Sequence, residues 1–202
     1  MTRAVLSIGS NIGDSLAHLR SVTAELGTRL VACSPVYRSA PWGGVEQQDF
    51  LNAVVVAEDD AFDAWDWLRF GQRLEEAADR VRVQRWGPRS LDVDVVVCEN
   101  MISEDPRLIL PHPRAHERAF VLLPWLDVEP DATLRVGDDD VPVTELLGRL
   151  SPEERAGVIE QEWSLQERPE KQEWSLQERP EKQEWSLQER PEEQEGVGDG
   201  LW

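Results

Sequence analysis

Two aspartates, Asp92 and Asp94, stand one residue apart in a β-branched run that follows the turn sequence Gly87-Pro88. Because side chains on a strand alternate between its faces, both carboxylates share one face, whereas Val93 and Val95 share the other. Two residues of strand place the aspartate Cα atoms roughly 6–7 Å apart. This spacing suits carboxylates that share hard divalent cations such as Mg²⁺, with phosphate oxygens completing the coordination shell. The alternative is that the pair is only the polar outer face of a strand.

The residues just before this pair are of the types that hold phosphates and planar rings. Arg85, Trp86 and Arg89 stand in the preceding turn. A guanidinium can bind a phosphate through two parallel hydrogen bonds, and an indole offers a flat face to a ring or a cation. Together with the two carboxylates, they favour a binding site over a plain polar face.

The charge of the chain is large and unevenly distributed. Its 202 residues carry a formal net charge of −19 at pH 7, which argues against nucleic acid or an anionic membrane as a partner. Residues 1–150 contain no lysine and 15 arginines, so a Walker-type phosphate loop, which needs a lysine, is excluded. Nine of these arginines form two clusters: Arg69, Arg73, Arg80, Arg82, Arg85 and Arg89, then Arg107, Arg114 and Arg118. A basic pocket on an acidic protein attracts a small anion and repels polyanions.

The two cysteines, Cys33 and Cys98, lie in separate apolar runs and form no Cys-x-x-Cys pair. This pattern is typical of reduced core residues in a cytoplasmic protein. The sequence shows no signal peptide and no apolar run of membrane-spanning length. We therefore expect a cytoplasmic protein, and a monomer.

The apolar pattern predicts an α+β fold. Two helices show a 3.6-residue apolar stripe; the first is capped by Asp14 or Ser15 and ended by Gly27, and the second turns Trp65 and Leu68 inward. The expected elements are strands at Arg3–Ile8, Leu30–Tyr37, Phe50–Glu58 and the Asp92/Asp94 segment, a helix over 15–26, a helix at Ala61–Asp79 and a hairpin at Asp131–Val143. They predict a sandwich in which a mostly antiparallel sheet carries its helices on one face. The other face is then free for loops and for the two carboxylates.

The last part of the chain is a tandem repeat. An 11-residue unit beginning Gln-Glu-Trp-Ser-Leu occurs three times with one difference, at Gln161–Lys171, Gln172–Lys182 and Gln183–Glu193. Each unit contains a proline, which breaks a helix, and residues 151–202 carry 15 acidic against six basic side chains. We therefore predict a folded domain over residues 1–157 and a disordered acidic tail over residues 158–202. The alternative is an interaction segment, whose tryptophans dock on the domain or on another copy of the chain.

Four segments occur in a characteristic order: Ser7-Ile-Gly-Ser-Asn-Ile-Gly13, Phe50-Leu-Asn-Ala53, Arg85-Trp-Gly-Pro-Arg-Ser-Leu-Asp-Val-Asp94 and Leu110-Pro-His112. Together they resemble the 6-hydroxymethyl-7,8-dihydropterin pyrophosphokinase family of folate biosynthesis, over about residues 1–150 and without the tail. The resemblance implies a ferredoxin-like α+β sandwich. It also implies an ATP-dependent diphosphokinase, which moves the β,γ-pyrophosphoryl group of ATP onto the hydroxymethyl oxygen of a reduced pterin and releases AMP.

The resemblance further implies how ATP is held. Asp92 and Asp94 would bind two Mg²⁺ ions along the triphosphate, and the catalytic arginines that clamp the phosphates would be Arg80, Arg82 and Arg89. The other residues implied at the nucleotide are Gln72, Glu75, Trp86, Arg107, His112 and Arg118. Pyrophosphoryl transfer depends on metals and fixed cations more than on covalent chemistry, which agrees with this set.

The acceptor site is implied in the same way. The pterin would lie between Phe50 and Phe120, with Asn52 at the edge of its ring. The residues implied to cover it are Ala40, Pro41 and Trp42. A flat heterocycle binds well between aromatic faces and beside an amide that donates and accepts together, so the residue types suit this ligand.

Several alternatives stay open at the level of the sequence. Asn52 fits a structural amide as well as a ligand contact, and His112 fits a general acid or base as well as a hydrogen-bond donor to phosphate. Arg107 and Arg114 could be surface charges, and Trp86 a core residue. For the whole protein, the alternatives are an inactive relative that binds nucleotide or pterin, and a different Mg²⁺-dependent nucleotide transferase.

Overall fold

One antiparallel sheet forms the centre of the fold. The computed structural model describes residues 2–41, 47–79, 88–99 and 101–166. The strands follow the order β10-β3-β4-β1-β5 across the sheet, and β2 also pairs with β4. In chain order the elements are β1 (Thr2–Ser10), α1 (Ser15–Leu26), η1 (Gly27–Arg29), β2 (Leu30–Cys33), β3 (Val36–Ser39), β4 (Phe50–Asp59), α2 (Ala64–Ala77), β5 (Asp92–Cys98), β6 (Ser103–Asp105), β7 (Leu108–Leu110), η2 (Ala115–Glu117), α3 (Ala119–Val128), β8 (Thr133–Val136), β9 (Asp139–Pro142), α4 (Val143–Arg149), α5 (Pro152–Ala156) and β10 (Val158–Gln161).

The strand expected at Leu30–Tyr37 is divided in two. β2 and β3 pair with successive parts of β4, and Ser34-Pro35 separates them. Proline has no N–H to donate to a strand ladder, and Ser34 turns the chain by exchanging hydrogen bonds with Val54 through its N–H and its Oγ. Because of this split, β3 pairs with the first residues of β4, Phe50–Asn52, where the candidate site lies.

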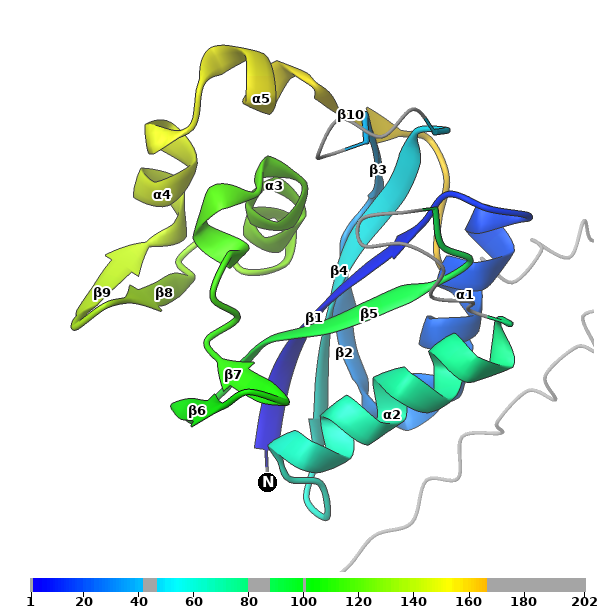
Figure 1. Cartoon of the computed structure of the whole chain (residues 1–202), viewed down its shortest axis with the longest axis horizontal. Coiled ribbons are helices and arrows are strands. Elements are labelled where there is room, and N and C mark those ends of the chain that lie inside the picture. The colour runs from blue at the N-terminus through cyan, green and yellow to red at the C-terminus, as the bar shows by residue number, and fades with distance from the viewer. Residues whose placement is uncertain (1, 42–46, 80–87, 100, 167–202) are drawn as a thin grey trace, which may run out of the picture. The chain divides into compact units, whose positions relative to one another are not determined.

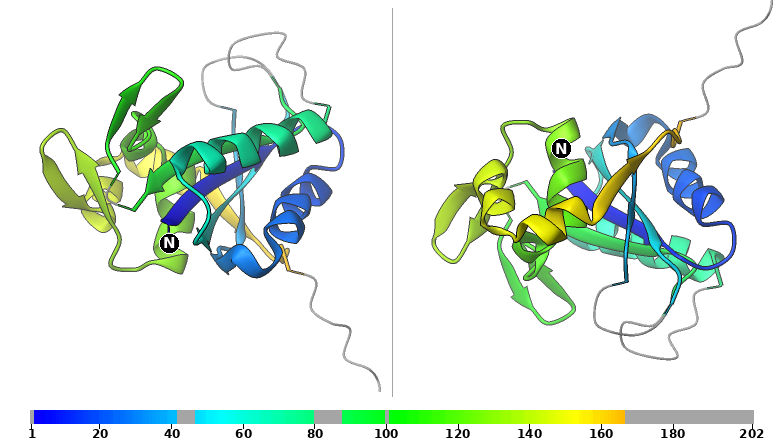
Figure 2. Two further views of the ribbon diagram at one scale, coloured as in Figure 1. Left: turned by 90° about the horizontal axis from the view of Figure 1, so that it is seen from below. Right: turned by 90° about the horizontal axis from the view of Figure 1, so that it is seen from above.

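Helices cover both faces of the sheet. α1 and α2 pack on one face in an apolar cluster with Leu6, Val55 and Trp67, and α3 packs on the other face with Val54 and Val56. Figure 1 shows α1 and α2 on one side of the strands and α3 on the other, and the views of Figure 2 agree. The predicted sandwich with an antiparallel sheet is confirmed, but its helices are not confined to one face. The consecutive valines of β4 are the cause, since a strand that is apolar on both sides must be covered on both.

The ends of α1 are those that the sequence predicts, whereas α2 begins later than expected. Asp14 caps α1 by accepting a hydrogen bond from Ala17 N, and Gly27 ends it with a φ of 53°, a left-handed conformation that favours glycine. α2 begins after Asp63, which forms a reciprocal capping box with Asp66. Helix starts are therefore decided by the capping side chains.

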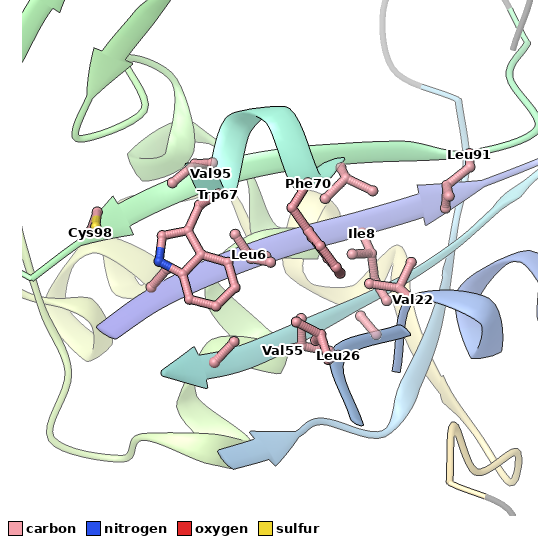
Figure 3. Packing of buried hydrophobic residues seen from close by; sticks show 14 of the residues in the cluster. Leu6, Ile8, Val22, Leu26, Val55, Trp67, Phe70, Leu91, Val95 and Cys98 are labelled. Atoms are coloured by element: carbon pink, nitrogen blue, oxygen red, sulfur yellow. The ribbon is translucent and has the colours of Figure 1, made fainter. Parts of the chain in front are cut away.

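The buried stripe of α2 differs from the expected one. Trp67 and Phe70 are buried in the core, as Figure 3 shows, and their rings meet edge to face with centroids 6.1 Å apart. Trp65 and Leu68, expected to point inward, pack only partly against this cluster. Gly71 brings the helix close to β5, because a Cβ there would lie 3.0 Å from a methyl group of Val93.

The folded domain continues past residue 157, where the sequence analysis places its end. Residues 158–166, called the strap below, contain β10 and a turn. β10 pairs antiparallel with β3, with Val158 opposite Ser39, and Figure 2 shows the segment crossing from α5 towards α1. The structure thus corrects the expected boundary. Residues 167–202, the rest of the predicted tail, lie outside the described residues, and their disorder stays a prediction.

The turn of the strap is fixed to α1 by contacts that composition does not reveal. Arg20 Nε donates a hydrogen bond of 3.0 Å to Ser164 O, and Thr23 Oγ1 donates one of 3.1 Å to Leu165 O. The side chain of Leu165 is 3% exposed and belongs to the apolar cluster under α1 and α2. Two backbone carbonyls and one buried leucine therefore hold the end of the strap on α1.

We expect a chain ending at Gly157 to be less stable than one ending at Gln166. Deleting a buried leucine side chain alone costs about 2–5 kcal/mol, and each kcal/mol lowers the Tm of a domain of this size by roughly 2–4 °C. Thermal unfolding followed by circular dichroism compares both truncated chains with the full chain. The chain ending at Gln166 should unfold close to the full chain, and an equally high Tm for the shorter one would show that the strap adds no stability.

Candidate active site

Three residues in one row across the sheet form the floor of the candidate site. Gly9 of β1 lies opposite Asn52 of β4 on one side and opposite Asp92 of β5 on the other. Directly opposed residues of antiparallel strands project to the same face. A Cβ at Gly9 would lie 3.1 Å from Asn52 Oδ1, so glycine leaves bare backbone between the amide and the carboxylate. α3 packs further along this face, over Val54 and Val96.

The two predicted carboxylates share this face, and each has a cationic neighbour. Asp94 pairs with Ser7 in the next row of the sheet. Its Oδ2 lies 3.6 Å from Arg118 Nη1 and 3.8 Å from His112 Nε2. Asp92 forms a close ion pair with Nη1 of Arg89. The structure therefore brings together five of the predicted site residues within one cluster: Arg89, Asp92, Asp94, His112 and Arg118.

Burial and like charge make Asp94 hard to ionise. Burial is the largest cause and the carboxylate of Asp92 the second, and together they raise the pKa of Asp94 to about 7, against the opposing effect of Arg118. Its side chain is nevertheless 37% exposed, so water screens part of this effect. A carboxylate strained in this way gains most from a further positive charge.

His112 is held as a neutral donor. The backbone N–H of His112 donates a hydrogen bond of 2.8 Å to Val96 O. In the ring, Nδ1 accepts a hydrogen bond of 3.2 Å from Arg114 N. The proton of the neutral ring therefore sits on Nε2, the nitrogen that faces Asp94. Burial, and next the charge of Arg118, lower the pKa of His112 to about 4. This arrangement favours the hydrogen-bond donor over the general base, since a base would need that nitrogen free of its proton.

Arg118 is buried with unused hydrogen-bonding capacity. Its side chain is 18% exposed, and its guanidinium lies 5.6 Å from the ring centroid of Phe120. Within the described part of the chain, its buried Nε has no hydrogen-bond partner. A buried guanidinium N–H without an acceptor costs free energy, so this position suits an anionic oxygen brought by a ligand.

Asn11, which was not among the predicted site residues, joins three segments of the site. Its Oδ1 accepts a hydrogen bond from Arg89 N, and its own N–H donates to Arg89 O. Its Nδ2 donates to Gln47 Oε1 and Gln48 O, each at 3.0 Å. The residue is 2% exposed, so these bonds are protected from water. An asparagine between Gly9 and Gly13 was the available signal.

The aromatic residues predicted for the acceptor lie beside two arginines of the cluster. The guanidinium of Arg89 lies 5.6 Å from the ring centroid of Phe50, and Arg118 stands equally close to Phe120. Asn52, 4% exposed, donates a hydrogen bond of 2.9 Å from Nδ2 to Ser39 Oγ. The amide is thus fixed in orientation next to a partly buried ring.

Other predicted nucleotide residues have different surroundings. Glu75 is buried and accepts a hydrogen bond of 3.0 Å from Val93 N, which satisfies a backbone donor of the edge strand β5. Arg107 is 75% exposed, pairs with Asp105 at 2.9 Å and stacks on Trp65. Neither forms part of the cluster around Asp94, although the charge of Glu75 contributes to raising its pKa.

The remaining predicted residues are on the surface or outside the described residues. Gln72 is an exposed residue of α2. Ala40 and Pro41 follow the end of β3, the first exposed and the second half-buried. The predicted residues that lie outside the described residues are Trp42, Arg80, Arg82 and Trp86.

Asp92 and Asp94 supply a ligand set that suits Mg²⁺ and not a metal ion coordinated by protein side chains alone. Among residues 2–41, 47–79, 88–99 and 101–166, no three His, Cys, Asp or Glu side chains converge as a complete metal site. Mg²⁺ is commonly bound by one or two carboxylates and completes its shell with water and substrate phosphates. Two oxygen donors on an open sheet face meet that requirement.

Comparison with known proteins gives consistent matches. A family model described as 7,8-dihydro-6-hydroxymethylpterin-pyrophosphokinase matches residues 5–130. A 2-amino-4-hydroxy-6-hydroxymethyldihydropteridine pyrophosphokinase of Mycobacterium tuberculosis is 52% identical over 167 residues, covering 78% of this chain and 89% of the relative. A protein of the same name from Methylorubrum extorquens is 44% identical over 156 residues, covering 75% of this chain and 96% of the relative.

Solved structures match at the level of the fold. The crystal structure of wild-type Plasmodium falciparum HPPK-DHPS aligns with a TM-score of 0.53 and 13% identity, over 73% of this chain and 44% of that chain. A crystal structure of HPPK-DHPS in complex with substrates aligns with a TM-score of 0.54 and 13% identity, over 73% of this chain and 43% of that chain. The chain thus spans less than half the length of these two proteins.

The raised pKa of Asp94 predicts a pH-dependent gain in stability for Asp94→Asn. A carboxyl whose pKa is higher in the folded than in the unfolded state costs stability as it ionises, so the wild-type protein loses stability as the pH rises through about 7. Without divalent metal or nucleotide, the Tm of Asp94→Asn relative to wild type should rise by a few degrees between pH 6 and pH 8.

Asp105→Asn is the matched control for this measurement. Hydrogen bonds from Arg107 lower the pKa of Asp105 to about 2, so this carboxylate stays ionised between pH 6 and pH 8. Its Tm difference from wild type should therefore not change over the same interval. A Tm difference for Asp94→Asn that is equally independent of pH would contradict the raised pKa.

Proposed function

Because the chain belongs to the 7,8-dihydro-6-hydroxymethylpterin-pyrophosphokinase family, we propose that the cluster around Asp92 and Asp94 is where it moves pyrophosphate from ATP to the pterin. The protein is an ATP-dependent pyrophosphokinase of folate biosynthesis. The observation that supports this location most directly is the convergence of two carboxylates with Arg89, Arg118 and His112.

The positively charged and neutral donors of the cluster would bind the triphosphate. Arg118 offers a buried Nε without a partner in the described part of the chain, and His112 offers a proton on Nε2. The backbone N–H and C=O of Arg89 both form hydrogen bonds with Asn11, so the position of the Arg89 backbone is fixed. Preorganised donors of this kind stabilise charge that develops on phosphate oxygens without a cost of reorganisation.

Asp92 and Asp94 would hold the Mg²⁺ ions that the family uses. When bound, Mg²⁺ neutralises charge on the triphosphate and orients its phosphates. The two carboxylates supply oxygen donors on one face. Burial, and next the negative charge of Asp92, raise the pKa of Asp94, so an added positive charge would favour its ionised form. The number of ions in our proposal is two, as the resemblance to the family implies.

The acceptor would occupy the floor formed by Asn52 and Gly9, beside Phe50 and Phe120. Asn52 is fixed by Ser39, so its amide can read the edge of a flat ring. The uncovered backbone at Gly9 gives a ring room to approach the sheet. The hydroxymethyl group of the pterin would then point toward the carboxylates, since Asp92 stands in the same row as Gly9 and Asn52.

The reaction then requires positioning more than covalent catalysis. The hydroxymethyl oxygen forms a bond to the β-phosphorus of ATP while the bond from that phosphorus to the oxygen bridging to the α-phosphate breaks, which releases AMP. The proton of the hydroxyl leaves to solvent or to a phosphate oxygen. No described residue is required as a strong base, because the surroundings of His112 keep its Nε2 protonated.

The surroundings in which the protein works also belong to the proposal. Cys33 and Cys98 are free thiols, and burial raises the pKa of both, which disfavours oxidation and suits the cytoplasm. No helix in the described ranges is long and apolar enough to cross a membrane. We also propose that the protein acts as a monomer.

Removing either carboxylate should abolish turnover while the fold persists. Asp92→Ala or Asp94→Ala removes charge that balances metal and phosphate, so AMP release from ATP with 6-hydroxymethyl-7,8-dihydropterin should fall on the order of 10³-fold or more. Asp138→Ala, at a fully exposed aspartate of the β8–β9 turn, is the control and should keep normal turnover. Normal turnover of both carboxylate variants at saturating Mg²⁺ would show that this cluster is not the metal site.

Asn52 and Ser39 allow a test of the acceptor site. Asn52→Ala removes the amide, whereas Ser39→Ala removes the same hydrogen bond from the other side and keeps the amide. We expect Asn52→Ala to weaken binding of the pterin by about tenfold or more, since one buried hydrogen bond to a ligand is worth about 1.5 kcal/mol. Isothermal titration with pterin in the presence of a non-hydrolysable ATP analogue measures this. Ser39→Ala, which loosens the amide but keeps it, should weaken binding less, and equal weakening by both variants would indicate a structural amide.

A further inference from the structure

We propose that the strap, residues 158–166, positions the acceptor half of the active site by holding strand β3 against β4. This inference rests on the proposed function, because it concerns the same pterin site. None of the described side-chain hydrogen bonds of the strap involves a predicted site residue. The effect of the strap would pass through β3, whose last residue, Ser39, is hydrogen-bonded to Asn52.

The first step is the position of β3 in the sheet. β3 has four residues, and its partners in β4 run only from Tyr37 opposite Asn52 to Ser39 opposite Phe50. β10 pairs with all four residues of β3 on its other side, from Val36 to Ser39. Without β10, this short strand would be the exposed edge of the sheet, with one row of backbone donors and acceptors unpaired. The strap therefore doubles the backbone pairing of the strand that leads to Ala40.

The second step is that the strap is fixed at its far end. Arg20 and Thr23 donate hydrogen bonds to consecutive carbonyls, and Leu165 is buried under α1. A strand that was attached only along β3 could fray with it. The anchor on α1 instead connects β3 to the helix that follows Asn11. The side chain of Asn11 in turn donates hydrogen bonds to Gln47 and Gln48, which precede β4.

The third step concerns the residues that β3 positions. Ser39 lies opposite Phe50 and bonds Asn52, so both predicted acceptor contacts on β4 depend on where the end of β3 lies. The arginines and carboxylates of the phosphate half are on β5 and on segments around it, and none of their described ion pairs involves β3 or β10. On β4, the described contact between the two halves is that of the Arg89 guanidinium with the ring of Phe50. Loosening the strap should therefore affect the pterin far more than ATP.

The test replaces the buried leucine and separates the two substrates. The repeat recurs along the chain, so alanine is introduced at all three equivalent positions of the full-length protein, Leu165, Leu176 and Leu187. Initial rates of AMP release give KM for the pterin, KM for ATP and kcat, well below the Tm of each variant. We expect KM for the pterin to rise about tenfold, with KM for ATP and kcat within about twofold of wild type. Methionine at the same three positions should restore KM.

A control separates positioning from a general loss of stability. Leu134→Ala removes a buried leucine of β8 from the other apolar cluster, remote from β3, and should lower the Tm without changing KM for the pterin. If the leucine variants do not fold, Thr23→Val removes the hydrogen bond to Leu165 O at nearly constant volume and should raise KM for the pterin two- to threefold.

The outcomes are distinguishable. An unchanged KM for the pterin in the alanine variant, or an equal rise in Leu134→Ala, would overturn the role of the strap and leave the proposed function intact. A parallel rise in KM for ATP would overturn it too, because the strap would then act on the whole domain. Absence of AMP release by the wild-type protein would overturn the proposed function as well.

Discussion

The repulsion between two neighbouring carboxylates is the interaction on which the site depends. Asp92 and Asp94 lie on one face of β5, and the burial of Asp94, with the neighbouring charge of Asp92 as the second cause, raises the pKa of Asp94 to about 7. The charges of Arg118 and Arg89 oppose this rise, whereas His112, whose own pKa is lowered to about 4, lies beside Asp94 as a neutral ring. The cations come from two parts of the chain, because Arg89 stands three residues before Asp92, whereas Arg118 follows β7 in the sequence.

Patterns that act within one element could be predicted from the sequence. The shared face of Asp92 and Asp94 on β5, the cap at Asp14 and the positive φ of Gly27 depend on a few neighbouring residues, and the structure contains them all. β1, in contrast, does not alternate, because it is buried throughout from Ala4 to Ser10. Errors arose where a distant element decides the outcome. The inward face of α2 is set by Gly71 against Val93, and this contact cannot be read from the helix alone. The same holds for α3, which covers the second face of the sheet.

The site shows the same division. The carboxylate pair and Arg89 could be predicted from residue types and spacing, whereas His112 and Arg118 were expected beside them through the resemblance to the family. The structure brings the five residues together, and their roles toward metal and phosphate stay predictions. Asn11 was missed because its role consists of hydrogen bonds to the backbone of Arg89 and Gln48, and such bonds need a fold to become visible. Arg107 illustrates the converse case: its type suits a phosphate, but its described contacts are Asp105 and Trp65.

The place of β10 at the outer edge of the sheet has a consequence for biosynthesis. A chain emerges from the ribosome from its N-terminus, and every other strand of the sheet precedes β10 by many residues. Because a new strand can be added to an exposed edge without moving the strands already paired, the nascent chain can assemble most of its sheet before residues 158–161 exist. Loop closure over such a long sequence separation is slow, so the addition of β10 is a late event in the maturation of the enzyme.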